Sequence, residues 1–421
     1  MKHLKYLISF IFLLINVFSF AQEILSWNGN KKYCDPTPGE ISIMACSPIT
    51  QGINPSETIY QDVVDCGFNL VTSQGSVEYF RQQFNLMGDL NLKYIVSTPN
   101  LLTNSRSSYI SGLKNNKHFG GWLLKDEPAF DYLNTLKEGY DGFYSQDSNN
   151  FVLVNLVGEL NKKFTGNFTE FSNYLDYIQQ LLKPQVWSYD YYPILNKNGK
   201  LMVMYDKFYA ALENFSKISK ETQRPFWAFC ESLAYKTKTY SRPAATENYF
   251  RFEAFSALAY GAQGIAYWTY GMRNSNPSET YTSALVDLKG KKTKAWYAAQ
   301  TVNREIRKFN DVFKNSIVKE VRHTGNVIYK GTKKLSGNFG PLKMVRSGNA
   351  GVLVSLIENQ GNQYVVIVNH DVLKKQKITL ELETNRTLQA ISLPNSPSYN
   401  WRNDISLTLD KGGYLIFKVM E

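Results

Sequence analysis

The fold is decided by a short apolar run that ends in two acids and a proline, Gly120-Gly121-Trp122-Leu123-Leu124-Lys125-Asp126-Glu127-Pro128. Leu123 and Leu124 predict a buried strand, and Pro128 cannot donate to a sheet ladder, so we expect the strand to end where the acids begin. In parallel α/β folds, ligands bind at the carboxyl ends of the strands. Asp126 and Glu127 are therefore placed for function. The alternative, two solvated acids of a loop, has to be weighed against the rest of the chain.

Short apolar runs alternate with helix-length amphipathic segments on both sides of this stretch. With it, the expected strands number eight and cover residues 41–45, 68–72, 94–97, 122–124, 151–154, 185–189, 225–229 and 264–268. The expected helices cover 56–66, 76–90, 130–145, 168–182, 201–222 and 246–260, and one more at 293–309 follows the last strand. This alternation predicts an α/β fold of βα units with a parallel sheet, and eight strands close a (β/α)8 TIM barrel. An open doubly wound sheet with fewer strands is the alternative.

Beyond about residue 310 the apolar pattern changes to period two, and helical patterns disappear. Expected strands there cover 317–321, 327–329, 351–357, 363–369, 376–382 and 413–419. The polar turn 358–362 between two apolar runs predicts a β-hairpin. We therefore predict a signal peptide at 1–21, a barrel at 22–311 and an antiparallel β-sandwich domain at 312–421.

The amino terminus has the layout of a secretory signal peptide. Lys2 and Lys5 precede an apolar run over 7–20, and Ser19-Phe20-Ala21 precedes Gln22. The run is too short for a membrane span, and no later segment is long and apolar enough for one. We expect a secreted or periplasmic protein without a membrane span.

Composition limits the partners and cofactors of this chain of 421 residues. The net charge of +11 is spread over scattered lysines, which is typical of a solvated surface; the alternative is an acidic polymer steered in as substrate. No nucleic-acid-binding motif is present. The four cysteines are too scattered for a disulfide framework or a zinc site, so we expect free buried thiols. The three histidines outside the signal peptide lack metal-ligand spacing, so we expect no metal.

Polar and aromatic side chains follow the expected strands. The fourth strand ends at Asp126 and Glu127, the sixth at Asp190 and the seventh at Glu231, and the eighth ends in the aromatic residues Trp268 and Tyr270. The further candidates for substrate contact are Gln74, Asn155, Tyr192, Trp268 and Tyr270. The barrel mouth is thus predicted to be acidic and aromatic.

This composition suits the cleavage of a glycosidic bond. The reaction needs one carboxylic acid to protonate the leaving oxygen and one carboxylate on the other side of the sugar ring. The two must have unlike environments so that one keeps its proton near neutral pH. Glu127 and Glu231 fit as that pair, with Asp190 in reserve as the second carboxylate. The remaining candidates, Asp126 and Asp190 included, are expected to bind substrate.

Each candidate also has a structural interpretation. Glu231 can serve as a salt-bridge partner, and Asp190 can brace the turn that follows it. Trp227 and Phe229 are expected in the barrel core. Arg242 can contact an acidic sugar, although an ordinary surface arginine is the default.

Three of these motifs resemble a known family. Lys125-Asp126-Glu127-Pro128, Glu231 and Trp268 resemble the clan of (β/α)8 glycoside hydrolases that carry the acid/base and the nucleophile at strands four and seven. The exported barrel followed by a β-sandwich is also similar to uncharacterised glycosidases of polysaccharide-degrading bacteria. The resemblance covers roughly residues 40–310. It implies Glu127 as acid/base, Glu231 as nucleophile and Trp268 as a platform under the sugar.

The chain departs from the clan at Asp126, where many members have asparagine. An ionised aspartate accepts from the 2-hydroxyl of the sugar but cannot donate to it, and its charge favours a proton on Glu127.

We therefore predict a secreted glycoside hydrolase, acting on a poly- or oligosaccharide by a retaining mechanism without a cofactor. The alternatives are a non-catalytic glycan-binding protein and a lyase of acidic polysaccharides that uses Tyr189, Tyr191 or Tyr192 as base. Sugar, linkage, endo or exo action and oligomeric state are left open.

Overall fold

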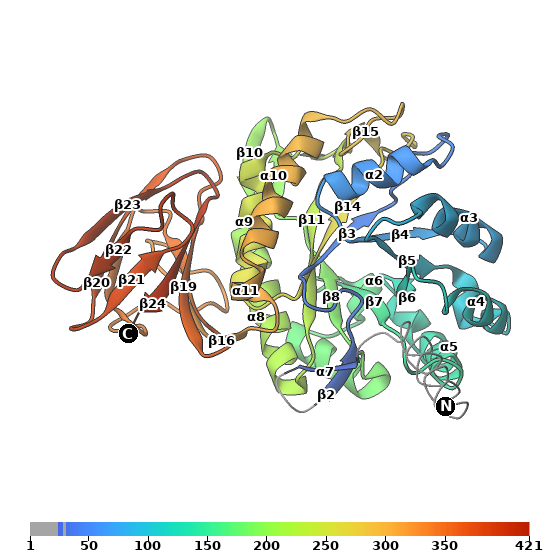
Figure 1. Cartoon of the computed structure of the whole chain (residues 1–421), viewed down its shortest axis with the longest axis horizontal. Coiled ribbons are helices and arrows are strands. Elements are labelled where there is room, and N and C mark those ends of the chain that lie inside the picture. Colours follow the sequence, from blue (N-terminus) through green and yellow to red (C-terminus); the bar gives the residue numbers. More distant parts are fainter. Residues whose placement is uncertain (1–23, 28–30, 421) are drawn as a thin grey trace, which may run out of the picture.

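The computed structural model describes residues 24–27 and 31–420, and the expected signal peptide at 1–21 lies outside them. Figure 1 shows two bodies side by side: a barrel wrapped by helices, coloured from blue to orange, and an all-β part in orange and red. Within the described residues, no helix is both long and apolar enough to cross a membrane. The first described strands, β1 (Ile24–Trp27) and β2 (Lys31–Cys34), form an antiparallel ribbon.

Eight parallel strands close the barrel, as the sequence predicts. They are β3 (Ser42–Cys46), β4 (Leu70–Gln74), β5 (Lys93–Ser97), β6 (Phe119–Asp126), β7 (Val152–Val157), β8 (Trp187–Asp190), β11 (Phe226–Glu231) and β14 (Gly264–Trp268). Their hydrogen-bonded order follows the chain, and β14 pairs with β3 to close the circle. Every predicted barrel strand overlaps an observed one, so the (β/α)8 fold is confirmed. The strand predicted at 122–124 is longer in the structure, where β6 has eight residues and ends at Asp126.

Helices surround the barrel strands. The longer ones are α2 (Glu57–Asp65), α3 (Val77–Met87), α4 (Arg106–Leu113), α5 (Leu133–Tyr144), α7 (Phe171–Leu182), α8 (Tyr205–Thr222), α9 (Glu247–Ala259) and α10 (Lys294–Lys308); shorter turns are η1 (Pro99–Leu102), η2 (Phe130–Tyr132), α6 (Lys162–Thr165) and α11 (Asn310–Phe313). Glycines end α2 and α9 as expected, with φ of 92° at Gly67 and 102° at Gly261. The sequence missed α4, because its serines and glycine weaken the apolar periodicity.

A second sheet forms beyond the carboxyl ends of β8, β11 and β14, and the sequence did not predict it. Its strands pair in the order β10 (Lys200–Val203), β9 (Ile194–Lys197), β13 (Ser241–Arg242), β12 (Ala234–Lys236) and β15 (Thr280–Ser283). The expected helix start at residue 201 is wrong, since 200–203 belong to β10 and α8 begins at Tyr205. These strands are two to four residues long, too short to show a period.

The carboxyl-terminal part is an antiparallel sandwich. One sheet has the order β16 (Ile317–His323), β18 (Val352–Asn359), β19 (Asn362–Asn369), β24 (Tyr414–Met420), β21 (Thr387–Ala390) and β22 (Ser398–Asn400); the other has β17 (Leu342–Ser347), β20 (Gln376–Leu382) and β23 (Ile405–Leu409). The predicted hairpin is β18–β19, in which Val352 pairs with Asn369. The strand expected at 327–329 is wrong. Tyr329 instead stacks on Tyr209, with ring centroids 5.2 Å apart.

Buried side chains fill the barrel and join it to the sandwich. Trp227 and Phe229 belong to the core inside the barrel, where Trp227 stacks on Phe151 at 5.0 Å, as expected for core residues. Between the domains, His323 bonds to the Tyr260 hydroxyl at 2.8 Å and to His370 at 3.1 Å. Burial lowers the pKa of both histidines, so this junction is neutral at pH 7.

The four cysteines, Cys34, Cys46, Cys66 and Cys230, are buried and free. Burial is the largest cause that raises the pKa of each thiol. The thiols are therefore protonated near neutral pH, and they act as small apolar core groups.

Gly121 gives a test of the strand that carries the site. Its φ is 137°, and a Cβ there would lie 2.6 Å from the Phe151 carbonyl oxygen, which accepts the Trp122 N–H. We expect Gly121→Ala to lower the free energy of unfolding by about 2–5 kcal/mol through backbone strain and overlap. Urea denaturation measures the loss.

The matched control is Gly39→Ala. Gly39 also has a positive φ, 79°, but nothing lies within 4 Å of its missing Cβ. This substitution should lower the free energy of unfolding only through backbone strain, by about 1–2 kcal/mol. Equal losses in the two variants would contradict the close approach at Gly121.

Candidate active site

Carboxyl groups gather at the carboxyl ends of β6, β8 and β11, where a parallel barrel places its ligands. Asp126 is the last residue of β6 and Glu127 follows it, while Asp190 ends β8 and Glu231 ends β11. All four were expected at strand ends, and the structure places them there. Their partners decide what each one can do.

Glu127 occupies a strained turn. Its φ is +38°, in the left-handed region that side-chain-bearing residues avoid, at a cost on the order of 1–2 kcal/mol. Its backbone N–H donates to the Asn155 carbonyl at 2.9 Å, which ties the turn to β7. Strain of this kind is concentrated at functional sites, and here it aims one carboxyl group into the barrel mouth.

Asn155 holds two of the carboxylates. Its Nδ2 donates to Asp126 Oδ1 and to Asp190 Oδ1, both at 3.0 Å, and its Oδ1 accepts from the Ser188 hydroxyl at 2.8 Å. The side chain is only 2% exposed and its amide is engaged on both sides. The expectation that Asn155 contacts substrate is therefore not met. Asn155 braces the acids instead.

Glu127 and Asp190 interact directly. A hydrogen bond with the Asp190 side chain lowers the pKa of Glu127, so the proton between the two carboxyl groups lies on Asp190. Burial raises the pKa of Asp190 well above its ordinary value, and the charges of Glu127 and Asp126 raise it further. Burial and then Asp126 raise the pKa of Glu127. The pair therefore titrates as a unit that retains one proton to higher pH than a free carboxyl group.

Glu231 has a different environment. It is 8% exposed, and burial raises its pKa well above the ordinary value, while the positive charge of Arg242 is the cause that acts in the opposite direction. Arg242 Nε lies 3.5 Å from Glu231 Oε1, and Arg242 Nη1 donates to the carbonyls of Tyr192 and Ile194 at 2.6 and 3.0 Å. The second sheet thus holds a cation against Glu231. Arg242 is an internal partner rather than an ordinary surface arginine.

Asp190 and Tyr192 lie between Glu127 and Glu231 in the electrostatics of the site, because Asp190 acts on both glutamates and on Tyr192. The charge of Asp190 raises the pKa of Glu231, so Asp190 acts on both Glu127 and Glu231. Tyr192 is partly buried, and after burial the charges of Asp190 and Glu231 are the largest causes that raise its pKa. A tyrosine hydroxyl that stays protonated among carboxylates can only donate or accept a hydrogen bond at neutral pH.

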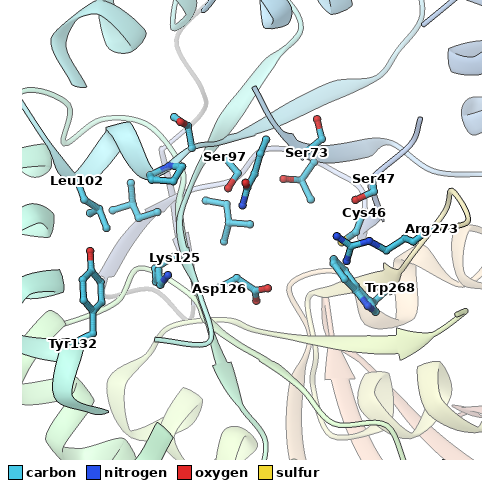
Figure 2. A pocket seen from close by; sticks show the side chains of 16 residues that line it. Cys46, Ser47, Ser73, Ser97, Leu102, Lys125, Asp126, Tyr132, Trp268 and Arg273 are labelled. Carbon is cyan, nitrogen blue, oxygen red and sulfur yellow. The ribbon is translucent and has the colours of Figure 1, made fainter. Parts of the chain in front are cut away.

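A cavity of about 450 Å³ opens beside this cluster. Asp126 lines it together with Gln74, Trp268, Lys125 and Arg273, and hydroxyl groups of β4 and β5 complete its wall. Figure 2 shows Lys125 and Arg273 on opposite sides of Asp126, with Trp268 beside Arg273. The Arg273 guanidinium lies 5.2 Å from the centre of the Trp268 ring. The volume falls in the range of small-ligand sites.

Tyr270 does not reach this cavity, and its expected contact with substrate is wrong. It is 1% exposed, and its hydroxyl accepts from Trp296 Nε1 of α10 at 3.0 Å. Its ring packs edge-on against Phe68 at 5.9 Å. The chain turns after Trp268, so Tyr270 packs between barrel and helix instead of at the mouth.

The sequence also missed Glu253, a buried acid behind Glu231. It lies on α9 between Phe252 and Phe255, and its Oε2 accepts the Glu231 backbone N–H at 2.9 Å. The sequence signal for it is a single acid, Glu253, among the phenylalanines of α9. Within the described residues, no group of three or more histidine, cysteine or acidic side chains is arranged to hold a metal ion.

Part of the chain is similar to a known protein family. Residues 134–309 match the family model described as beta-galactosidase, glycoside hydrolase family 42, which is less than half of the chain. No curated protein sequence matches it.

Similar solved structures include a family 42 β-galactosidase from G. stearothermophilus, at 9% identity over 91% of this chain and 98% of that chain with a TM-score of 0.60. A β-galactosidase from Bacillus circulans sp. alkalophilus is similar at 8% identity over 91% and 99% of the two chains, TM-score 0.60. An Anoxybacillus α-amylase is similar at 10% identity over 90% and 98%, TM-score 0.52. At such identities the likeness establishes the fold.

The family match and the barrel fold agree with the resemblance that the sequence carries. The chain is a (β/α)8-barrel glycoside hydrolase. A carbohydrate is therefore its substrate.

The crowding of acids gives a stability test. The folded state raises the pKa of Asp190, so the stability present at acid pH is lost as pH rises from about 4 through that raised pKa. Asparagine cannot ionise, so Asp190→Asn should be more stable than the parent at pH 8, by on the order of 1–3 kcal/mol, with the gain shrinking towards pH 4. Thermal melts across this range measure it.

Asp176→Asn is the control, since Asp176 is an exposed residue of the same kind on α7. It should show no gain that grows with pH. An Asp190→Asn protein less stable than the parent at pH 8 would contradict the proposed repulsion.

Proposed function

We propose that the protein is a retaining glycoside hydrolase that cleaves a β-galactoside in a poly- or oligosaccharide, with Glu127 as acid/base and Glu231 as nucleophile. The observation that carries the proposal is the unlike setting of the two carboxyl groups. Burial and the charge of Asp126 raise the pKa of Glu127, whereas Glu231 faces Arg242. Retaining chemistry needs one protonated and one ionised carboxyl group. The galactoside is suggested by the family match.

In the first step Glu127 gives its proton to the glycosidic oxygen as the bond to the anomeric carbon breaks. The ionised Glu231 attacks that carbon and forms a glycosyl ester, and the leaving sugar departs as an alcohol. In the second step Glu127, now a carboxylate, takes a proton from water. The water oxygen attacks the anomeric carbon, the ester bond breaks, and Glu231 regains its charge.

Neighbouring residues support each step. The charge of Asp126 raises the pKa of Glu127 and so favours the protonated acid before the first step. Arg242 stabilises the carboxylate form of Glu231 between turnovers. The cavity lined by Asp126, Gln74 and Trp268 offers hydrogen-bonding groups and an aromatic face for a sugar. Tyr192, on which the charges of Asp190 and Glu231 both act, is our candidate for a contact with the sugar.

A lyase mechanism is less well supported. It needs a base, and burial raises the pKa of all three candidates, Tyr189, Tyr191 and Tyr192. A glycan-binding role without catalysis would not need a strained Glu127 or acids with raised pKa values. Both alternatives predict that removing a single carboxyl group leaves no hydrolytic defect to measure.

We infer that the protein is exported, because residues 1–21 have the layout of a signal peptide. The amino-terminal sequence of protein recovered from the periplasm or the medium should begin at Gln22. Recovery in the cytoplasm with Met1 retained would overturn export without affecting the proposed chemistry.

Glu127→Gln and Glu231→Gln test the mechanism. Each should lower kcat/KM on a galacto-oligosaccharide by about 10²–10⁴-fold or more, with folding retained. Glu127→Gln should lose much less on 4-nitrophenyl β-D-galactopyranoside, because nitrophenolate leaves without a proton, while Glu231→Gln should lose both activities. Proton NMR of the first-formed product should give the β anomer.

Glu159→Gln is the matched control, since Glu159 pairs with Lys207 at 2.5 Å on the rim after β7. It should retain activity. Full turnover in both site variants would contradict the assignment. Loss in Asp190→Asn but not in Glu231→Gln would make Asp190 the second carboxylate, and an ultraviolet-absorbing unsaturated product would indicate a lyase.

A further inference from the structure

Glu253 is a buried acid to which the proposed mechanism gives no part. It lies in the middle of α9 and is only 3% exposed. Its Oε2 accepts the backbone N–H of Glu231 at 2.9 Å, and its carboxyl group also bonds to the Cys230 thiol. Two consecutive residues at the end of β11 are therefore held from behind by one side chain.

This contact sits where the barrel mouth begins. Glu231 is the register partner of Trp268 on β14, and the next two backbone N–H groups, of Ser232 and Leu233, donate to the Trp268 carbonyl at 2.8 and 3.1 Å. The strand thus leaves the barrel immediately after Glu231. The Glu253 carboxyl group fixes the last backbone position before that turn, which is the one that carries the reacting side chain.

The groups that face Glu253 come from three strands. Cys230 and Glu231 lie on β11, Arg242 on β13 and Tyr267 on β14. Burial raises the pKa of Glu253 to about 8, with Arg242 acting in the opposite direction. Glu253 is therefore neutral at neutral pH. When it ionises above that range, its charge raises the pKa of Glu231.

We propose that Glu253 is a positioning residue for Glu231: its carboxyl group fixes the end of β11, and its proton keeps a second negative charge away from the nucleophile. The inference rests on the proposed role of Glu231. Since Glu253 does not touch the sugar, its effects should appear in kcat and in the pH profile, whereas KM should change little.

Two variants separate the parts of this proposal. Glu253→Gln keeps a hydrogen-bond acceptor but cannot ionise. It should retain activity near pH 6 within about 3-fold, and the alkaline limb of its kcat/KM profile should move up by about 0.5–1 pH unit. Glu253→Leu fills the space but removes the acceptor, so kcat should fall by about 10–100-fold at unchanged KM.

Glu247→Gln is the matched control. Glu247 lies on the first turn of the same helix and pairs with Arg251 at 2.9 Å, away from β11. It should leave kcat and the alkaline limb unchanged. If Glu253→Leu is folded with an unaltered kcat, or if the limb of Glu253→Gln does not move, the positioning role is overturned.

An infrared measurement keeps the test independent of turnover. The spectrum of the parent minus that of Glu253→Gln at pH 6 should contain the carbonyl band of a protonated carboxylic acid, and the band should vanish as pH rises through about 8. Absence of the band at pH 6 overturns the proposed proton. Should Glu253→Leu fail to fold, this spectrum and the Glu253→Gln profile decide.

Glu231→Gln, assayed beside these variants, separates failure of this inference from failure of the proposed function. If Glu231→Gln abolishes turnover and the Glu253 variants behave like the parent, only the positioning role fails. If Glu231→Gln retains full turnover, the assignment of Glu231 itself fails.

Discussion

The carboxamide of Asn155 is the interaction on which the barrel mouth depends. Its two N–H groups reach Asp126 and Asp190, which belong to different strands, and Ser188 fixes its orientation from the far side. Without these two N–H donors, the negative charges of Asp126 and Asp190 would repel each other with no hydrogen bond to offset the repulsion. A single buried amide therefore lets the barrel concentrate carboxyl groups, and the raised pKa of Asp190 favours its neutral form, which reduces the remaining repulsion.

The backbone of β6 has to be irregular to use this arrangement. Its pairing slips against β5 near Ile95 and against β7 between Leu123 and Lys125. Such irregularities re-aim side chains near active sites. Gly121 permits the close approach of Phe151, just before β7, at one end, and the left-handed turn at Glu127 directs the acid at the other. The Trp122 N–H donates to the Phe151 carbonyl and the Glu127 N–H to the Asn155 carbonyl, and these bonds hold the segment in place.

The sequence predicted the barrel well and the site in part, for a physical reason. Local periodicity predicts strands and helices, and glycine and proline residues such as Gly67 and Pro128 mark where these elements end. A side chain's partners depend on packing between distant segments, which periodicity does not contain. The sequence therefore predicts Asn155 as a ligand contact, Tyr270 at the barrel mouth and Arg242 on the surface, whereas in the structure all three contact protein partners. The sequence also does not predict the second sheet, which contains Arg242, because its strands are too short to show an apolar period.

The two proposed catalytic glutamates have the same side chain and comparable positions, and the barrel alone cannot make them differ. The difference comes from elements outside the barrel strands. Glu127 has an acid neighbour and is driven towards the protonated form, while the second sheet brings Arg242 to Glu231 and α9 places the neutral Glu253 behind it. Because Glu253 is neutral near pH 7, Arg242 acts on Glu231 without a competing charge from the helix. The repeating fold supplies positions for the carboxyl groups, and its irregular additions determine which charges each of them faces.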